Sequence, residues 1–427
     1  MQRANTMDSL FITGLASAYP SHSLKQEDFE DLLTRVYPDC IADPGLQKLV
    51  HFNRKTNIKS RPTIFDFSTW TKQDAKPPSL NEQSSIYRDI GVALSAQACS
   101  KAMLEAHVSA SDITHLVAVT CTDQSNPGYD LYVCQKLGLR ASVERILLHG
   151  VGCAGGLSAL RTAANLATAA SSRGQAARIL VVACELCSLS FRAEIQTCLS
   201  DGELHIAPAL FSDAAAAVVL CNILALTQSS NPIFQLQEWG SMFVPGTSGQ
   251  MSYAIEANGM IANITKDVPK TAISAILPML NTLLNTSNNP THLNPLNFDW
   301  ALHPGGSAIL NGAKQHLQLA DEHIRASLNI YGAYGNSSSP TVLIVLDQLR
   351  CMGRGRDDVV ATSFGPGVAI EMVLMKRCRG VEIRSPVSVV VSGKRHKFWM
   401  ELQSWITGVG KKNVVGKGLG RWSAVVR

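Results

Sequence analysis

The stretch HGVGCAGGLSAL, residues 149–160, places one cysteine among glycines directly before an alanine- and leucine-rich run that is typical of a helix. A thiol at the start of a helix lies beside unpaired backbone N–H groups and the positive end of the helix dipole, which favour the thiolate. The glycines permit a tight turn and let a substrate approach backbone amides that can hold an oxyanion. Cys153 is therefore a candidate nucleophile, although a small buried cysteine in a close-packed helix start explains this stretch equally well.

Apolar runs with helical spacing alternate with short β-branched runs on both sides of this stretch. Such alternation predicts an α/β protein with largely parallel, buried strands. The predicted helices are 90–108, 155–171, 270–285 and 316–329, and the predicted strands are 113–122, 177–185, 298–304 and 359–375.

Two segments resemble each other, LFSDAAAAVVL at 210–220 and SFGPGVAIEMVLM at 363–375. Each places a phenylalanine and a turn of small residues before a β-rich apolar run, which indicates a duplicated fold. We therefore expect one half over residues 1–230, a second half over 231–379 and a tail over 380–427. The tail carries nine basic and two acidic residues, so the positive net charge of +5 comes from the tail and not from the main body.

Composition narrows the class of protein further. The 427 residues are 46% hydrophobic, yet no run reaches the roughly 18 apolar residues of a membrane span. We expect no export signal at the N-terminus, and the eleven cysteines lack the spacing of a disulfide scaffold, which favours a cytoplasmic location. Cys184 and Cys187 form a CxxC in an apolar strand without a second pair, so we interpret them as buried cysteines and predict no metal site.

Two further residues are candidate partners for a cysteine nucleophile. His303, in WALHPGGSAIL at 300–310, follows a buried apolar strand at the end where α/β proteins collect ligand sites. Asn336, in IYGAYGNSSSPTVLIVL at 330–346, occupies a glycine-flanked turn before an apolar run, as Cys153 does. A structural histidine and an ordinary helix cap are the alternatives.

The four motifs GCAGG, HPGG, YGNSSS and FGPG, in this order and at these separations, resemble those of the chalcone-synthase-like type III polyketide synthases of the thiolase superfamily. The resemblance covers residues 8–378 and is strongest toward fungal members. It implies a thiolase-type duplicated five-layer αβαβα fold, a homodimer, and a functional loop at Gly365, Pro366 and Gly367.

The resemblance also implies a separate role in the reaction for each of the three candidate residues. Cys153 would accept the starter acyl group from its CoA thioester and carry the growing chain. His303 and Asn336 would donate hydrogen bonds to the thioester carbonyl of malonyl-CoA while carbon dioxide leaves. This chemistry needs no metal and no redox cofactor, and its cyclised products would be alkylpyrones, resorcinols or resorcylic acids.

By the same resemblance, QKLVHFNRKTNIKSRP at 47–62 matches the region that binds CoA. Lys48 and Lys55 would contact the CoA phosphates, and His51 stands where the family usually has arginine. A solvated basic helix face is the alternative interpretation.

Four residues match positions that shape the cavity in the family. Phe211 matches the first of two gating phenylalanines, whereas Ala262 stands at the second, and Ser190 and Ser338 match lining positions. A methyl group in place of a ring leaves more room, so we hypothesise a fatty acyl starter.

Two rival functions remain at this point. A ketoacyl-ACP synthase III would perform a single condensation with malonyl from a carrier protein. A non-catalytic protein would use its basic tail, with Trp399, Trp405 and Trp422, for binding. Because the tail contains no recognisable module, we expect neither a nucleic-acid partner nor an integral membrane contact.

Overall fold

The computed structural model describes residues 9–256, 259–286 and 294–379. Nine of its strands form one continuous sheet in the order β11-β12-β13-β8-β1-β7-β6-β4-β5. Two small antiparallel pairs, β2 with β3 and β9 with β10, stand apart from it. The strands are β1 (Leu10–Ala18), β2 (His22–Lys25), β3 (Ser60–Thr63), β4 (His115–Val119), β5 (Glu144–Leu148), β6 (Arg178–Leu186), β7 (Asp213–Asn222), β8 (Phe234–Phe243), β9 (Met251–Glu256), β10 (Gly259–Ile264), β11 (Phe298–Leu302), β12 (Asp358–Gly365) and β13 (Ala369–Arg377).

The large sheet is mixed, which corrects the expectation of largely parallel strands. Only the pairs β11–β12, β4–β5 and β4–β6 are parallel. The central strands β7, β1, β8 and β13 pair antiparallel with their neighbours. β6 and β7 are nevertheless buried on both faces, and burial on both faces produces the continuous apolar runs that had indicated parallel pairing.

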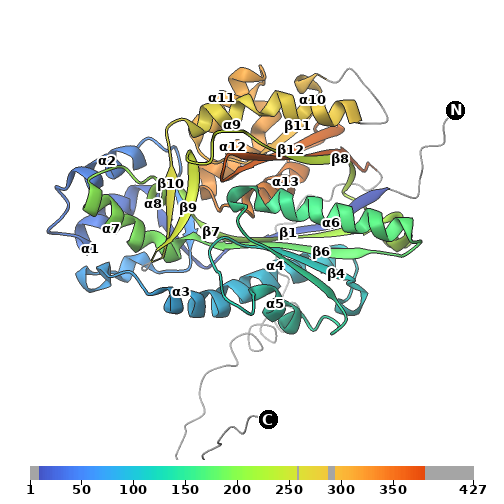
Figure 1. Ribbon diagram of the computed structural model, residues 1–427, viewed down its shortest axis with the longest axis horizontal. Coiled ribbons are helices and arrows are strands. Elements are labelled where there is room, and N and C mark those ends of the chain that lie inside the picture. The colour runs from blue at the N-terminus through green and yellow to red at the C-terminus, as the bar shows by residue number, and fades with distance from the viewer. Residues whose placement is uncertain (1–8, 257–258, 287–293, 380–427) are drawn as a thin grey trace, which may run out of the picture. The chain divides into compact units, whose positions relative to one another are not determined.

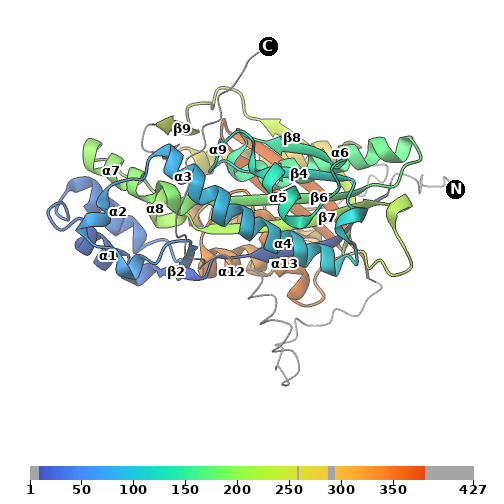
Figure 2. The same ribbon diagram turned by 90° about the horizontal axis from the view of Figure 1, so that it is seen from below.

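Helices cover the outer faces of the sheet, and further helices lie between its two halves (Figure 1). α6 and α13 lie between the strands of the first half and those of the second, and their apolar residues belong to one core with both sets. α4 and α5 cover the outer face of β4, β6 and β7 (Figure 2). The helices are α1 (Phe29–Val36), α2 (Pro44–Asn53), α3 (Leu80–Ile86), α4 (Val92–Glu105), α5 (Tyr129–Leu137), α6 (Gly155–Ser172), α7 (Phe191–Asp201), α8 (Ala207–Leu210), α9 (Val268–Ser274), α10 (Ile276–Thr286), α11 (Ser307–His316), α12 (Arg325–Tyr334) and α13 (Thr341–Cys351).

Three predicted elements differ from the structure. The helix expected over 270–285 is two helices, α9 and α10, because Pro278 cannot donate the backbone hydrogen bond that would continue one into the other. The strand expected over 359–375 is the antiparallel hairpin β12–β13, which turns at Pro366 and Gly367. The helix expected over 316–329 is wrong in its first half, since α11 ends at His316 and α12 begins at Arg325.

The predicted tail, 380–427, lies outside the described residues. Among the helices that are described, none combines the length and the apolar character needed to cross a membrane.

Candidate active site

Cys153 lies in a short 3-10 turn, Gly152–Ala154, that opens directly into α6. Gly152 has φ +48°, and a Cβ at this position would lie 2.6 Å from Cδ of Pro366. A Cβ on Gly365 would lie 2.4 Å from the carbonyl oxygen of Val151. The loop between β12 and β13 therefore packs directly on the cysteine turn, and glycine is required on both sides of this contact.

Asn336 lies in a second glycine-dependent turn, between α12 and α13. Gly335 before it has φ +71°. The backbone of Asn336 then forms a parallel bridge with Phe211, donating to the carbonyl of Leu210 at 3.0 Å and accepting from the N–H of Ser212 at 2.9 Å. Asn336 and Phe211, which lie far apart in the sequence, are thus fixed side by side.

The side chain of Asn336 connects the remaining parts of the site. Its Oδ1 accepts from the backbone N–H of Ser338 at 2.8 Å, and the Ser338 hydroxyl lies 3.5 Å from Sγ of Cys153. Its Nδ2 donates to the carbonyl of Gly305 at 3.5 Å, two residues after His303. Cys153, His303 and Asn336 are all buried, and these contacts gather the three turns that carry them.

Burial shifts the pKa values of Cys153 and His303. It raises the pKa of Cys153 to about 11, although hydrogen bonds from Ser338, Asn336 and Tyr253 act in the opposite direction. It lowers the pKa of His303 to about 3, and neither ring nitrogen has a hydrogen-bond partner among the described residues. The structure thus favours a neutral thiol beside a neutral imidazole over the thiolate expected at a helix start, because desolvation outweighs the helix dipole. A neutral imidazole has a free nitrogen that can take a proton.

Glu185, at the end of β6, braces the wall of the site from behind. Its buried carboxylate accepts from the backbone N–H groups of Cys121 and Thr122 at 3.0 and 3.1 Å, and from the hydroxyls of Thr120 at 3.1 Å, Thr122 at 2.9 Å and Ser339. The Ser339 bond ties the Asn336 turn to the β6 edge of the sheet. Glu185 therefore helps to position the site through the residues that it binds, and not by direct contact with Cys153 or His303.

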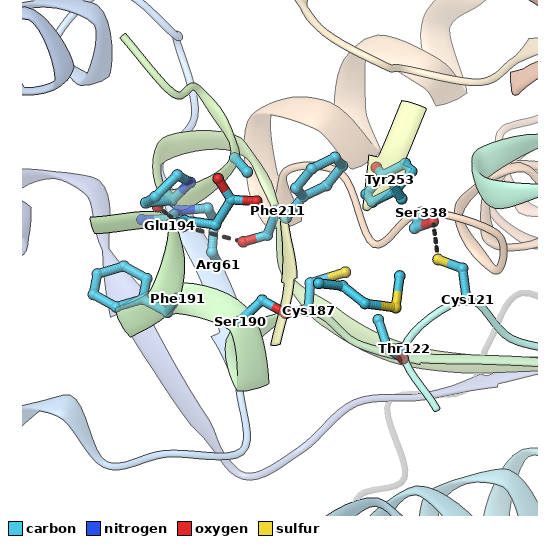
Figure 3. Close-up of a pocket in the computed structure, with 13 residues that line it drawn as sticks. Arg61, Cys121, Thr122, Cys187, Ser190, Phe191, Glu194, Phe211, Tyr253 and Ser338 are labelled. Carbon is cyan, nitrogen blue, oxygen red and sulfur yellow. Dashed lines mark hydrogen bonds between the residues drawn. The ribbon is translucent and has the colours of Figure 1, made fainter. Parts of the chain in front are cut away.

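A cavity lies beside Ser338 and extends toward α7 and α8 (Figure 3). Three of the four predicted cavity residues, Phe211, Ser190 and Ser338, line it. The lining residues are Arg61, Cys121, Thr122, Cys187, Ser190, Phe191, Glu194, Ala207, Pro208, Phe211, Tyr253, Met260 and Ser338.

The fourth predicted position, Ala262, is buried on β10 but does not belong to the lining. Its direct partner across the β9–β10 hairpin, Tyr253, supplies a ring to the cavity wall instead. The ring edge also approaches the cysteine turn, since a Cβ on Gly152 would lie 3.7 Å from Cε2 of Tyr253. An aromatic ring is therefore present in this hairpin, on the strand opposite to Ala262.

The predicted CoA residues lie together on one exposed segment. Lys48 and His51 are on α2, and Lys55 follows two residues after the helix ends. Lys48 donates to the carbonyl of Gly202 and to the carboxylate of Glu203, both at 2.9 Å. Across the described ranges, no group of three or more histidine, cysteine, aspartate or glutamate side chains is arranged to hold a metal ion.

Sequence reasoning missed several cavity residues. Cys187 had been interpreted only as a buried cysteine, yet it lines the cavity together with Cys121. Glu194 could have been found, because it stands three residues after Phe191 and four before Cys198, on the buried face of α7. Tyr253 could not, since its position depends on the register of the hairpin.

Comparison with known proteins identifies the class. The model of the chalcone and stilbene synthase N-terminal domain matches residues 1–222, and that of the C-terminal domain matches residues 235–379. The type III polyketide synthase pspB of Penicillium soppii is 45% identical over 86% of this chain and 96% of its own length. The acylalkylpyrone synthase csyB of Aspergillus oryzae is 33% identical over 86% of this chain and 94% of its own. The type III polyketide synthase C of Arabidopsis thaliana is 29% identical over the same shares.

Solved structures agree with these matches. A fungal type III polyketide synthase, ORAS, and a type III pentaketide synthase from Neurospora crassa each superpose with a TM-score of 0.83 at 38% identity, over 86% of this chain and 100% of theirs. CsyB complexed with CoA-SH superposes with a TM-score of 0.83 at 32% identity, over 87% of this chain and 100% of that one.

The fold and these matches define a condensing acyltransferase of the α/β type. The chain belongs to the chalcone and stilbene synthase family, the type III polyketide synthases. The family resemblance read from the four motifs is thereby confirmed, and so is its fungal character, since the two fungal relatives are more similar than the plant one.

Proposed function

We propose that this protein condenses malonyl-CoA repeatedly onto an acyl-CoA starter held as a thioester on Cys153. The observation that carries the proposal is the packing of the Cys153, His303 and Asn336 turns into one buried site next to a cavity. The name of the relative csyB, an acylalkylpyrone synthase, and the CoA complex of CsyB support the substrate class.

The first half-reaction loads the starter. A free nitrogen of His303 takes the proton of the Cys153 thiol, and the sulfur attacks the carbonyl carbon of the acyl-CoA. The new C–S bond forms as the bond to the CoA sulfur breaks, and the imidazolium returns its proton to the departing CoA thiolate. The raised pKa of Cys153 makes this transfer depend on His303, because the thiol does not ionise alone at neutral pH.

The second half-reaction extends the chain. When malonyl-CoA loses carbon dioxide, negative charge moves to the thioester oxygen, where His303 and the Nδ2 of Asn336 are the available donors. The enolate carbon attacks the Cys153 thioester and the cysteine sulfur leaves, so that the lengthened chain is carried on CoA. Return of this chain to Cys153 permits another cycle, and cyclisation releases a pyrone, a resorcinol or a resorcylic acid.

The starter that we propose is a fatty acyl group. Apolar side chains of the cavity, among them Phe191, Pro208, Phe211 and Met260, give an alkyl chain a surface to pack against. Lys48, His51 and Lys55 are the residues that we propose for CoA, since they share one exposed segment of positive charge.

We further infer a homodimer whose protomers have the duplicated five-layer fold, with halves at 1–230 and 231–379. A reducing compartment suits the protein, because all eleven cysteines are free.

The test is mass spectrometry of products formed from malonyl-CoA and acyl-CoA starters of graded length, beside a Cys153→Ala variant. We expect pyrones or resorcinols that fall by at least about a thousandfold in the variant, because the covalent carrier is lost. A single condensation that requires malonyl-ACP would contradict the proposal and would identify a ketoacyl-ACP synthase III instead. Absence of products with both donors would favour a non-catalytic role.

A further inference from the structure

The cavity contains a carboxyl group that the proposed condensation does not use. Glu194, on α7, lines the cavity and is only 3% exposed. Its Oε1 accepts from the backbone N–H of Ala262 at 2.7 Å, whereas its Oε2 has no hydrogen-bond partner among the described residues. His205 is close, but its Nδ1 lies 3.9 Å from Oε2 and its Nε2 is bound to Asp201 at 2.8 Å.

The place of Glu194 on its helix makes this arrangement costly. Phe191, Glu194, Ile195 and Cys198 form the buried face of α7, where an apolar side chain would pack without penalty. A buried carboxyl with an unfilled oxygen loses its hydration and gains only one bond in return. Groups of this kind are retained where a ligand completes them.

A second polar group in the cavity has the same property. Arg61, also 3% exposed, donates through Nε to Gln26 Oε1 at 2.9 Å, and through Nη1 to the carbonyls of Pro208 and Phe211. Its Nη2 has no hydrogen-bond partner in the described part of the chain, although the guanidinium lies over the ring of Phe29. Arg61 and Glu194, which both line the cavity with Phe191 (Figure 3), thus leave one donor and one acceptor without hydrogen bonds. The same lining also includes the apolar residues Ala207 and Met260.

We propose that the cavity selects acyl groups that carry a hydroxyl on the chain, away from the thioester, and that Glu194 binds this hydroxyl. A hydroxyl can donate to the Glu194 carboxyl, and an oxygen lone pair on the chain can accept from Nη2 of Arg61. An unsubstituted alkyl chain leaves both groups unsatisfied and removes them further from water. The inference rests on the proposed condensation and narrows its starter from fatty acyl to hydroxylated fatty acyl groups.

The protonation of Glu194 fits such a ligand. Burial raises its pKa to about 8, so the carboxyl keeps its proton at neutral pH. A neutral carboxyl can both donate to and accept from a hydroxyl, and the cavity then holds no uncompensated anion beside the acyl chain.

The experiment compares paired starters, dodecanoyl-CoA against dodecanoyl-CoA hydroxylated at successive carbons, by the ratio of their kcat/KM values. The variants are Glu194→Leu, which removes the polar group, and Glu194→Gln, which keeps its shape. Glu322→Gln is the matched control, because it replaces a glutamate by glutamine on the exposed 3-10 turn Asp321–Ile324. In the wild type and the control, we expect one hydroxyl position to be preferred at least about tenfold over the plain chain.

In Glu194→Leu we expect the preference to reverse toward dodecanoyl-CoA, and in Glu194→Gln to persist in weakened form. Circular dichroism confirms that each variant is folded. A binding readout without turnover comes from Cys153→Ala, in which the preferred hydroxyacyl-CoA should raise the unfolding temperature more than the plain chain does.

The outcomes separate the inference from the proposed function. Products that depend on Cys153 but show no hydroxyl preference, or a preference that Glu194→Leu leaves unchanged, would overturn the inference and leave the condensation intact. Failure of every acyl-CoA to give product would overturn both.

Discussion

Two buried glutamates stand nine residues apart, Glu185 at the end of β6 and Glu194 on α7, and their surroundings differ sharply. Six donor groups, from Thr120, Cys121, Thr122 and Ser339, surround the Glu185 carboxylate. Glu194 lines the cavity, receives one backbone N–H, from Ala262, and has one oxygen without a hydrogen-bond partner among the described residues.

The difference shows how burial alone fails to indicate a role. Burial raises the pKa of both carboxyls, yet Glu185 is a structural acceptor whose oxygens are occupied, and Glu194 has capacity left for a ligand. The distinguishing property is the number of hydrogen bonds that the protein itself supplies.

The largest expected effect comes from making the same change at both positions. Glu185→Gln places an amide NH2 toward groups that are themselves donors, so we expect the free energy of unfolding to fall by about 2–4 kcal/mol. The Asn336 turn, which Ser339 anchors to Glu185, should loosen and product formation should drop. Glu194→Gln should leave the free energy of unfolding unchanged or raise it. Chemical denaturation of both variants measures the contrast, and equal losses would remove the distinction between the two sites.

A smaller effect should appear in the pH dependence of stability. The pKa of Glu194 is raised from about 4.5 to about 8 in the folded state, so the folded protein binds a proton that the unfolded chain releases. The stability linked to this group is therefore fully present below pH 4.5 and is lost as the pH rises through 8.

We expect the wild type to lose stability relative to Glu194→Gln across that window, by at most about 5 kcal/mol. Thermal unfolding at a series of pH values tests this. A constant difference between the two proteins from pH 4.5 to 8 would show that Glu194 titrates normally, contrary to its burial.

The smallest effect is expected at a third, exposed carboxylate, which provides a reference for the losses in the free energy of unfolding at the two buried ones. Glu203 pairs with Lys48 at the surface and its side chain is 71% exposed. Because water screens the attraction between exposed charges, Glu203→Gln should change the free energy of unfolding by less than about 1 kcal/mol. The same denaturation experiment measures it, and a loss as large as that of Glu185→Gln would mean that burial has little part in the comparison.

Much of the site could be predicted because it depends on local rules. The glycines around Cys153 and before Asn336 are needed by turns with positive φ, and the sequence displays them directly. The helix that follows Cys153 and the strand that leads to His303 were also placed correctly, since their apolar patterns are long and regular.

The remainder depends on how distant segments pair. Strand direction in the sheet follows from the connections between strands, which an apolar run does not specify. Ala262 pairs with Tyr253 across the β9–β10 hairpin, and the register of that hairpin decides which side chain reaches the cavity. The protonation of Cys153 was misjudged because the helix start is visible in the sequence, whereas the desolvation that opposes it is produced by the assembled fold.

The close contact of Gly152 with Pro366 has a consequence for biosynthesis. A Cβ at position 152 would stand 2.6 Å from Cδ of Pro366, so the shape of the cysteine turn depends on a loop that leaves the ribosome much later. At about 5–20 residues per second, the ribosome takes on the order of 10–40 s to reach that loop after it has made the cysteine. During this interval the nascent chain carries the thiol without the packing that shapes its turn. The cysteine turn therefore takes its final shape only after most of the chain has been made.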